Sequence, residues 1–172
     1  MLSGVMPGAG PTWNSMWWTP RVHLAIFVHR VEQFPPGLYL LMRDPQVFDR
    51  LRAACRPEFL WEVVDEGLPL RCLTRGDVRS LAARLSCDQD IAADGFFSLG
   101  MLADFAASLQ TFGPSFYRHL FWETGMVGQA LGLRDHAFQS LYHFTVGMTV
   151  DDARLTTERG YSWEAPSTDE GR

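Results

Sequence analysis

The chain has 172 residues, of which 47% are hydrophobic and 13% aromatic, a size and composition that predict one domain with a buried core. Its net charge of −5 does not favour nucleic acid as a partner, and because all 15 basic residues are arginine, Schiff-base and P-loop lysines are excluded. Three cysteines without a CxxC pair, a start unlike a signal peptide and no run of about 20 apolar residues predict a soluble, cytoplasmic protein.

The first part of the chain predicts a lead-in followed by a hairpin. Residues 1–20 are rich in glycine, proline and serine, which favours an irregular segment. Residues 22–31 and 37–43 are rich in β-branched and aromatic residues, and a Pro-Pro-Gly turn joins them, so they predict a β-hairpin. Both runs are apolar on both faces, which places the hairpin inside a covered sheet.

A helix, a strand and a second helix are expected next. Asp44 and Pro45 suit an N-cap and first helical position, so a helix is predicted from there. Residues 68–74 predict a strand. Residues 76–86 predict a helix with Val78, Leu81 and Leu85 on one face.

The remaining part of the chain completes an α+β pattern. Residues 96–105 predict a strand, and residues 113–131 predict the longest helix, with Phe116, Leu120, Val127 and Leu131 recurring on one side. Residues 138–148 alternate as a strand, and residues 162–172 form a polar tail. Because strands and helices do not alternate regularly, the expected class is α+β, with one domain over residues 21–161.

Sequence signatures of catalysis and metal binding are missing or incomplete. Residues 95–100 have one residue too many for a hydrolase GxSxG turn. His119 and Glu123 stand one helical turn apart, but no further ligand completes a metal site, so we interpret them as a helix-surface pair. His29 and His143 lie in apolar runs, where a hydrogen-bonded core histidine is the default. No catalytic side chain and no metal site are therefore predicted.

Three glycines interrupt the long helix and its end. Gly125, Gly128 and Gly132 fall within eight residues, and each glycine in a helix costs about 1 kcal/mol relative to alanine. Close approach of a second backbone in a homodimer would account for them, as would a flat cofactor lying against the helix. A helix that simply ends near Gly125 is the third alternative, and periodicity does not separate the three.

Several longer motifs resemble one family. Residues 23–44 (HLAIFVHRVEQFPPGLYLLMRD), 86–105 (SCDQDIAADGFFSLGMLADF), 116–129 (FYRHLFWETGMVGQ) and 131–161 occur in the order in which similar segments stand in SagB-type dehydrogenases. These proteins are the branch of the nitroreductase family that includes thiazole/oxazole-forming peptide oxidases. The resemblance covers about residues 20–161.

The resemblance implies a nitroreductase-like α+β fold, with a mixed, mostly antiparallel sheet flanked by helices. It also implies a homodimer that holds FMN between its two copies. The activity it implies is hydride transfer through the flavin, from NAD(P)H or an azoline-type substrate to an acceptor, with a small molecule or a peptide as substrate. The cofactor would carry the chemistry, which agrees with the missing catalytic signatures.

Two departures from the family suggest a truncated chain. The family begins with an Arg-Arg-Ser element that holds the FMN phosphate, and here only Arg21 stands near that place. Gln129 is joined almost directly to Leu131-Gly132-Leu133, where these proteins have a further turn and strand beside the flavin ring. The alternative function is therefore a non-catalytic family member that acts as a binding or scaffold subunit, or one without function.

Four residues are candidates for FMN binding. Arg154 matches an arginine that resembles a phosphate contact in the family, and a bidentate guanidinium suits a phosphate. A solvated surface arginine is the alternative at that position. Arg21 is the candidate left at the N-terminal end. Gly128 and Gln129 would approach the ring edge, with core packing as their alternative.

Overall fold

The computed structural model describes residues 2–32, 34–131 and 145–146, and it has an α+β fold built on an antiparallel sheet. Within these residues the sheet has six strands, in the order β3-β4-β2-β1-β5-β6. Its strands are β1 (Val22–Val28), β2 (Gly37–Leu41), β3 (Glu62–Asp65), β4 (Leu70–Arg75), β5 (Phe97–Ala103) and β6 (Thr145–Val146). The helices are η1 (Leu2–Val5), α1 (Pro11–Asn14), η2 (Pro45–Val47), α2 (Phe48–Ala54), α3 (Arg79–Leu85), α4 (Ile91–Asp94), α5 (Phe105–Phe112), η3 (Pro114–Phe116) and α6 (Tyr117–Ala130).

The predicted hairpin is confirmed and forms the centre of the sheet. β1 pairs with β2 in antiparallel register, from Leu24 opposite Leu41 to Val28 opposite Gly37. β5 pairs with the other side of β1, and β4 pairs with the other side of β2, so β1 and β2 are both interior strands. Because side chains alternate between the two faces of such a strand, a run that is apolar throughout is buried on both sides.

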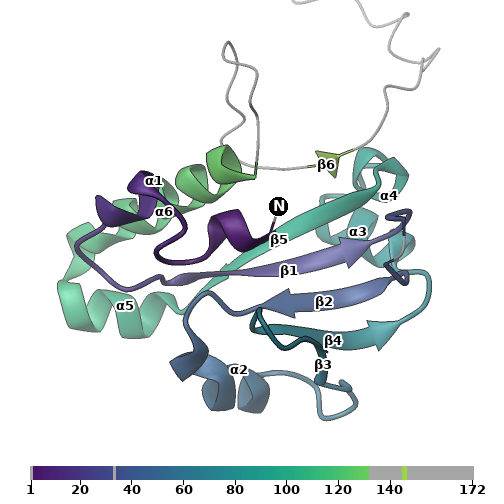
Figure 1. Cartoon of the computed structure of the whole chain (residues 1–172), viewed down its shortest axis with the longest axis horizontal. Coiled ribbons are helices and arrows are strands. Elements are labelled where there is room, and N and C mark those ends of the chain that lie inside the picture. Colours follow the sequence, from purple (N-terminus) through teal and green to yellow (C-terminus); the bar gives the residue numbers. More distant parts are fainter. Residues whose placement is uncertain (1, 33, 132–144, 147–172) are drawn as a thin grey trace, which may run out of the picture.

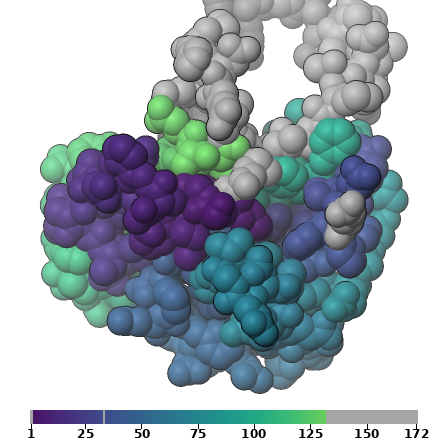
Figure 2. Space-filling model, viewed as in Figure 1, coloured from purple at the N-terminus to yellow at the C-terminus, as the bar shows by residue number. Residues whose placement is uncertain are grey.

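Helices cover both faces of the sheet. On one face, Leu24 and Ile26 of β1 pack with Val127 of α6 and with Val5 and Trp13 of the N-terminal segment. On the other face, α2, α3 and α4 pack over the sheet. The core residues there are Phe27, Leu38, Leu40, Met42, Trp61, Leu73, Val78, Ala82 and Ala92. Figure 1 shows the N-terminal segment between α6 and β1, and Figure 2 shows it packed against α6 at the surface.

The prediction of an irregular lead-in was wrong for Leu2–Val5 and Pro11–Asn14. That segment contains the helical turns η1 and α1, and it buries Val5 and Trp13 in the core next to α6. Composition misled the prediction, because glycine and proline here separate short helical turns. Strand β3 was not predicted, and all four of its side chains are exposed, so it has no alternating pattern to detect.

The helix predictions are largely confirmed. Asp44 caps the first by accepting a hydrogen bond from the backbone of Gln46, and the predicted strands of β4 and β5 are also present. Val78, the residue just before α3, packs in the core as expected, but Leu85 at the end of α3 is 67% exposed and does not belong to the packed face. Among the described residues, no helix is long and apolar enough to cross a membrane.

Helix α6 runs without a break past Gly125 and Gly128 to Ala130, so the interpretation that it ends near Gly125 is wrong. Of the predicted strand 138–148, Thr145 and Val146 form β6, and its other residues lie outside the described part. Gly132, His143 and the tail after residue 161 also lie outside it.

Candidate functional site

Glu123 of α6 is fully buried and anchors the start of β1 to the helix. Its carboxylate accepts hydrogen bonds from the backbone N–H groups of Arg21 and Val22, each at 3.0 Å, and from the indole N–H of Trp18 at 3.0 Å. It also pairs with the guanidinium of Arg43. The sequence interpretation of a helix-surface pair at this turn was therefore wrong, because this carboxylate lies in the core.

Arg43 is the buried partner of that carboxylate and binds the N-terminal segment as well. Its Nε donates to the carbonyl oxygen of Val5 at 2.7 Å, and its guanidinium lies 4.3 Å from the ring centre of Trp13. Burial lowers the pKa of Arg43, and the carboxylate of Glu123 opposes that shift. Since both charges are buried and hydrogen-bonded, we call Arg43 and Glu123 the clasp, and we assign it the structural role of fixing residues 2–22 against α6.

Next to the clasp lies a group of aromatic rings around His119, which we call the aromatic cluster. Its members are Trp17, Trp18, Phe112, Phe116, His119 and Trp122. The imidazole ring centre of His119 lies 4.7 Å from that of Trp122 and 5.5 Å from that of Trp17. Trp17 is 64% exposed and Trp122 is 55% exposed. The cluster therefore presents indole surface to solvent on both sides of a nearly buried imidazole.

Arg21 lies at the edge of the aromatic cluster, and one N–H group of its guanidinium has no hydrogen-bond partner among the described residues. Its guanidinium stands 5.2 Å from the ring centre of Phe112. The Nε of Arg21 and the Nδ1 of His119 are buried and have no hydrogen-bond partner among the described residues. Because buried polar groups are normally hydrogen-bonded, two such atoms beside exposed rings indicate a place where a ligand could bind.

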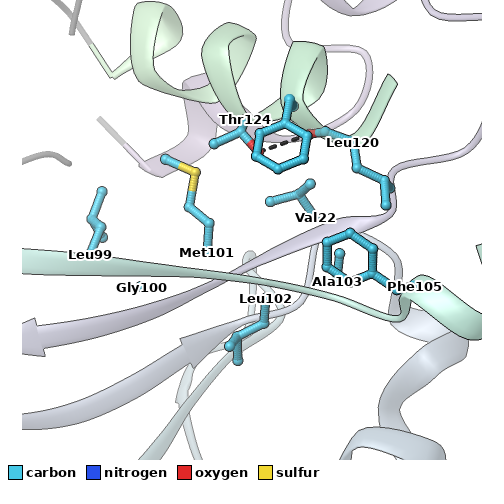
Figure 3. A pocket seen from close by; sticks show the side chains of 10 residues that line it. Val22, Leu99, Gly100, Met101, Leu102, Ala103, Phe105, Leu120 and Thr124 are labelled. Carbon is cyan, nitrogen blue, oxygen red and sulfur yellow. Dashed lines mark hydrogen bonds between the residues drawn. The ribbon is translucent and has the colours of Figure 1, made fainter. Parts of the chain in front are cut away.

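A hollow lies between β5 and α6, apart from the aromatic cluster. Figure 3 shows it from close by, and its lining residues are Val22, Leu99, Gly100, Met101, Leu102, Ala103, Phe105, Leu120, Phe121 and Thr124. Of these, only Thr124 has a polar side chain, and its hydroxyl donates to the carbonyl oxygen of Leu120 at 2.8 Å. We call this hollow the crevice. Its volume of about 220 Å³ is below the range of roughly 300–1,000 Å³ that is usual for small-molecule sites.

The structure brings together only some of the predicted FMN-binding residues. Arg21 lies beside the aromatic cluster, where Glu123 holds its backbone. Gly128 is buried and Gln129 is exposed near the end of α6, the latter about 9 Å along the helix axis from Glu123. Arg154 lies outside the described residues.

The tryptophans of the aromatic cluster were not among the residues predicted to form a site. Trp17 and Trp18 are adjacent in a segment that was taken as irregular, and Trp122 was regarded only as part of a helix motif. The repeated tryptophans before residue 20 were the available signal, because so many large rings in a short segment need a surface to pack on.

FMN combines a flat aromatic ring system with a phosphate, and the aromatic cluster and the crevice suit it differently. The aromatic cluster offers indole faces for stacking and an arginine with an unused N–H group for an anion. The crevice offers apolar walls without a charged side chain. The described residues therefore fit parts of FMN at the aromatic cluster and do not fit its phosphate in the crevice.

No metal site accompanies these groups in the described part of the chain, where no three His, Cys, Asp or Glu side chains gather around a common point. Glu123 binds Trp18, Arg21 and Arg43.

Comparisons with known proteins found few similarities. No protein-family model matches the chain, and no curated protein matches it. One solved structure with which it aligns is a presumed nitroreductase from Anabaena variabilis, at 18% sequence identity and a TM-score of 0.46. The aligned region covers 64% of this chain and 18% of that protein, so the chain spans less than a fifth of its length.

Proposed function

We propose that the chain is a flavin-dependent oxidoreductase of the nitroreductase kind, in the SagB-type branch, and that it binds FMN at the aromatic cluster. The sequence motifs over residues 20–161 support the family. The unpartnered Nε of Arg21, whose guanidinium lies against the ring of Phe112 in the aromatic cluster, is the observation that carries the location. A phosphate would supply the acceptor that this N–H group lacks.

In this proposal the protein binds and orients the cofactor. Trp17 and Trp122 would hold the ring system by stacking, and Arg21 would hold the phosphate. Glu123 is a positioning residue, because it holds the backbone N–H of Arg21. FMN supplies the hydride chemistry that links NAD(P)H or an azoline-type substrate to an acceptor.

A homodimer completes the proposed site. Tyr117, Phe121 and Trp122 of helix α6 are all partly exposed, and Phe105 packs against Tyr117 at a ring-centre distance of 5.7 Å. Such a row of exposed aromatic side chains is typical of a surface that meets a partner. A second copy against this face would cover the rings and enclose FMN between the two chains.

A non-catalytic binding or scaffold subunit is the second candidate function. One observation favours it: Arg43 and Glu123, the two charged groups that are completely buried among the described residues, pair with each other in the clasp, and neither lines the crevice. A chain of this kind would keep the aromatic surface for a protein partner and would bind no flavin.

The absorption spectrum of the purified protein distinguishes the two functions. Bands near ~450 nm that persist through desalting, or that appear on titration with FMN, support the flavin protein. Replacing Arg21 by alanine keeps the backbone bond to Glu123 and removes one charge-assisted contact of about 1.5–3 kcal/mol, so FMN affinity should fall roughly 10- to 100-fold. The matched control is Arg84→Ala, on the exposed side of α3, which should leave FMN affinity unchanged. Protein that stays colourless with added FMN would support the scaffold.

A further inference from the structure

His29 directly follows β1 and connects that strand to α4. Its side chain is buried, and its Nε2 lies 2.9 Å from the carbonyl oxygen of Ala92. The backbone N–H of His29 donates to the carbonyl oxygen of Phe96 at 3.0 Å, which fixes the position of the residue. Figure 1 shows α3 and α4 at the end of the sheet toward which β1 runs. The imidazole is therefore a direct link between the sheet and the short helix that precedes β5.

The contact with Ala92 determines which nitrogen of the neutral ring carries the proton. A carbonyl oxygen can only accept a hydrogen bond, so Nε2 must bear the hydrogen. Nδ1 is then an acceptor without a hydrogen, and it is buried with no hydrogen-bond partner among the described residues. Protonation of the ring would place a second N–H group at Nδ1, where no described group accepts it.

Charged groups of both signs lie around the ring. On the elements that pack there, they are Arg30, Asp77, Arg79, Asp90 and Asp94. Arg79 binds the carboxylate of Asp77 at 2.6 Å, so that negative charge already has a partner. Burial acts most strongly and lowers the pKa of His29 from 6.5, although the hydrogen bond to Ala92 favours the charged ring. The closed arrangement therefore suits the neutral ring better than the charged ring.

Helix α4 is the element that can move away from this contact. It has four residues, of which only Ala92 is buried, and its first residue, Ile91, is 64% exposed. A single helical turn that buries one methyl group gains little from packing. β1, by contrast, is paired with neighbouring strands on both sides. Separation at the contact between His29 and Ala92 therefore costs least when α4 moves and the sheet stays intact.

We propose that His29 is a pH-sensitive latch, and that protonation of Nδ1 releases α4 from the end of β1. In the open form the ring is in water, where Nδ1–H has an acceptor, so the open form binds the proton more readily and acid favours opening. Opening uncovers the part of the core to which Ala92 belongs. Because α4 packs on the face of the sheet away from α6, the latch does not rest on FMN binding.

The titration of one histidine limits the size of the effect. An exposed imidazole has a pKa of about 6.5, so lowering the pH from 7.5 to 5 can raise the opening constant by at most about 30-fold. The rise is smaller when the pKa of the closed form is less strongly lowered. We expect a rise of at least about threefold over this range.

Hydrogen exchange in the unmodified protein measures the opening of α4. The amides of Ala93 and Asp94 donate to the carbonyl oxygen of Asp90, so their protection reports on this helix. Corrected for the intrinsic exchange rate, their protection should fall at least about threefold between pH 7.5 and pH 5. It should also stay below that of Leu40 in the interior strand β2. A smaller fall, or protection equal to that of Leu40 at pH 5, would overturn the proposal.

Two variants separate the latch from other titrating groups. His29→Gln keeps an N–H group that can donate to Ala92 but takes up no proton, so the protection of α4 should no longer depend on pH. The matched control is His23→Asn, which removes another buried histidine and should leave the response of α4 unchanged. The proposal is wrong if His29→Gln responds to pH as the unmodified protein does.

The nitrogen resonances of His29 in the ¹⁵N-labelled, unmodified protein give a second test, whether or not the variants fold. At pH 7.5 the ring should be the tautomer with hydrogen on Nε2. Hydrogen on Nδ1 would overturn the proposal, because that ring has no donor for the carbonyl oxygen of Ala92. Both measurements are made without FMN, so their failure is distinct from failure of the proposed function.

Discussion

The clasp is the strongest single test of how this fold is held together. Replacing Glu123 by alanine leaves the guanidinium of Arg43 buried without its partner. Breaking a buried ion pair from one side costs about 3–5 kcal/mol. The same change removes the acceptor for the backbone N–H groups of Arg21 and Val22 and for the indole of Trp18. Each group left without a partner costs a further amount of about 1–3 kcal/mol, although these terms are not additive.

We therefore expect Glu123→Ala to lower the free energy of unfolding by about 4 kcal/mol or more. Domains of this kind are stable by about 5–15 kcal/mol, so the variant should be close to unfolding. Glu123→Gln keeps the shape and one acceptor oxygen but loses the charge, and its loss should be smaller. Urea unfolding followed by tryptophan fluorescence measures both, because Trp13 and Trp18 lie against the clasp.

Two comparisons make this result decisive. Glu62 pairs with Arg75 at the surface, so Glu62→Ala should change stability by no more than about 1 kcal/mol. When Arg43 is first replaced by methionine, the buried guanidinium that Glu123 neutralises is no longer present. Glu123→Ala should then cost about 2–3 kcal/mol less than in the unmodified protein. A loss below about 1 kcal/mol for Glu123→Ala, or equal losses in the two backgrounds, would refute the role of the clasp.

Three further predictions concern other parts of the fold. Burial, followed by the charge of a neighbouring arginine, lowers the pKa of His23 from 6.5 to about 4, so the unfolded chain binds its proton more readily. The contribution of His23 to the free energy of unfolding should be fully present above pH 6.5 and fall by about 3 kcal/mol as the pH drops to 4. His23→Asn should flatten this part of the pH dependence, measured by urea unfolding at each pH. A Cβ on Gly37 would lie 2.4 Å from the backbone oxygen of Thr74, so Gly37→Ala should cost about 1–3 kcal/mol by thermal unfolding; an unchanged melting temperature would contradict this contact. Asp104 caps α5 by accepting from the backbone N–H of Ala107 at 2.9 Å, and Asp104→Ala should cost about 1 kcal/mol in the same assay, whereas Asp104→Asn should retain most of the capping.

Local patterns in the sequence were sufficient for most of the sheet and its helices. The hairpin of β1 and β2 follows from β-branched and aromatic residues on either side of a proline-glycine turn. Asp44 with Pro45 and the spacing of Phe116, Leu120 and Val127 located two helices, because capping and burial depend on residues only a few positions apart. These features need no knowledge of the rest of the chain.

The sequence by itself determined the α+β class, the central hairpin and the packed side of α6. Only the tertiary structure decided that Glu123 is a buried anchor, and that Trp17 and Trp122 meet around His119 beside Arg21. The reason is distance along the chain. Glu123 binds backbone groups about a hundred positions earlier, and periodicity within one helix carries no information about partners so remote. Such a contact can be identified only in the folded chain, where the start of β1 packs against α6.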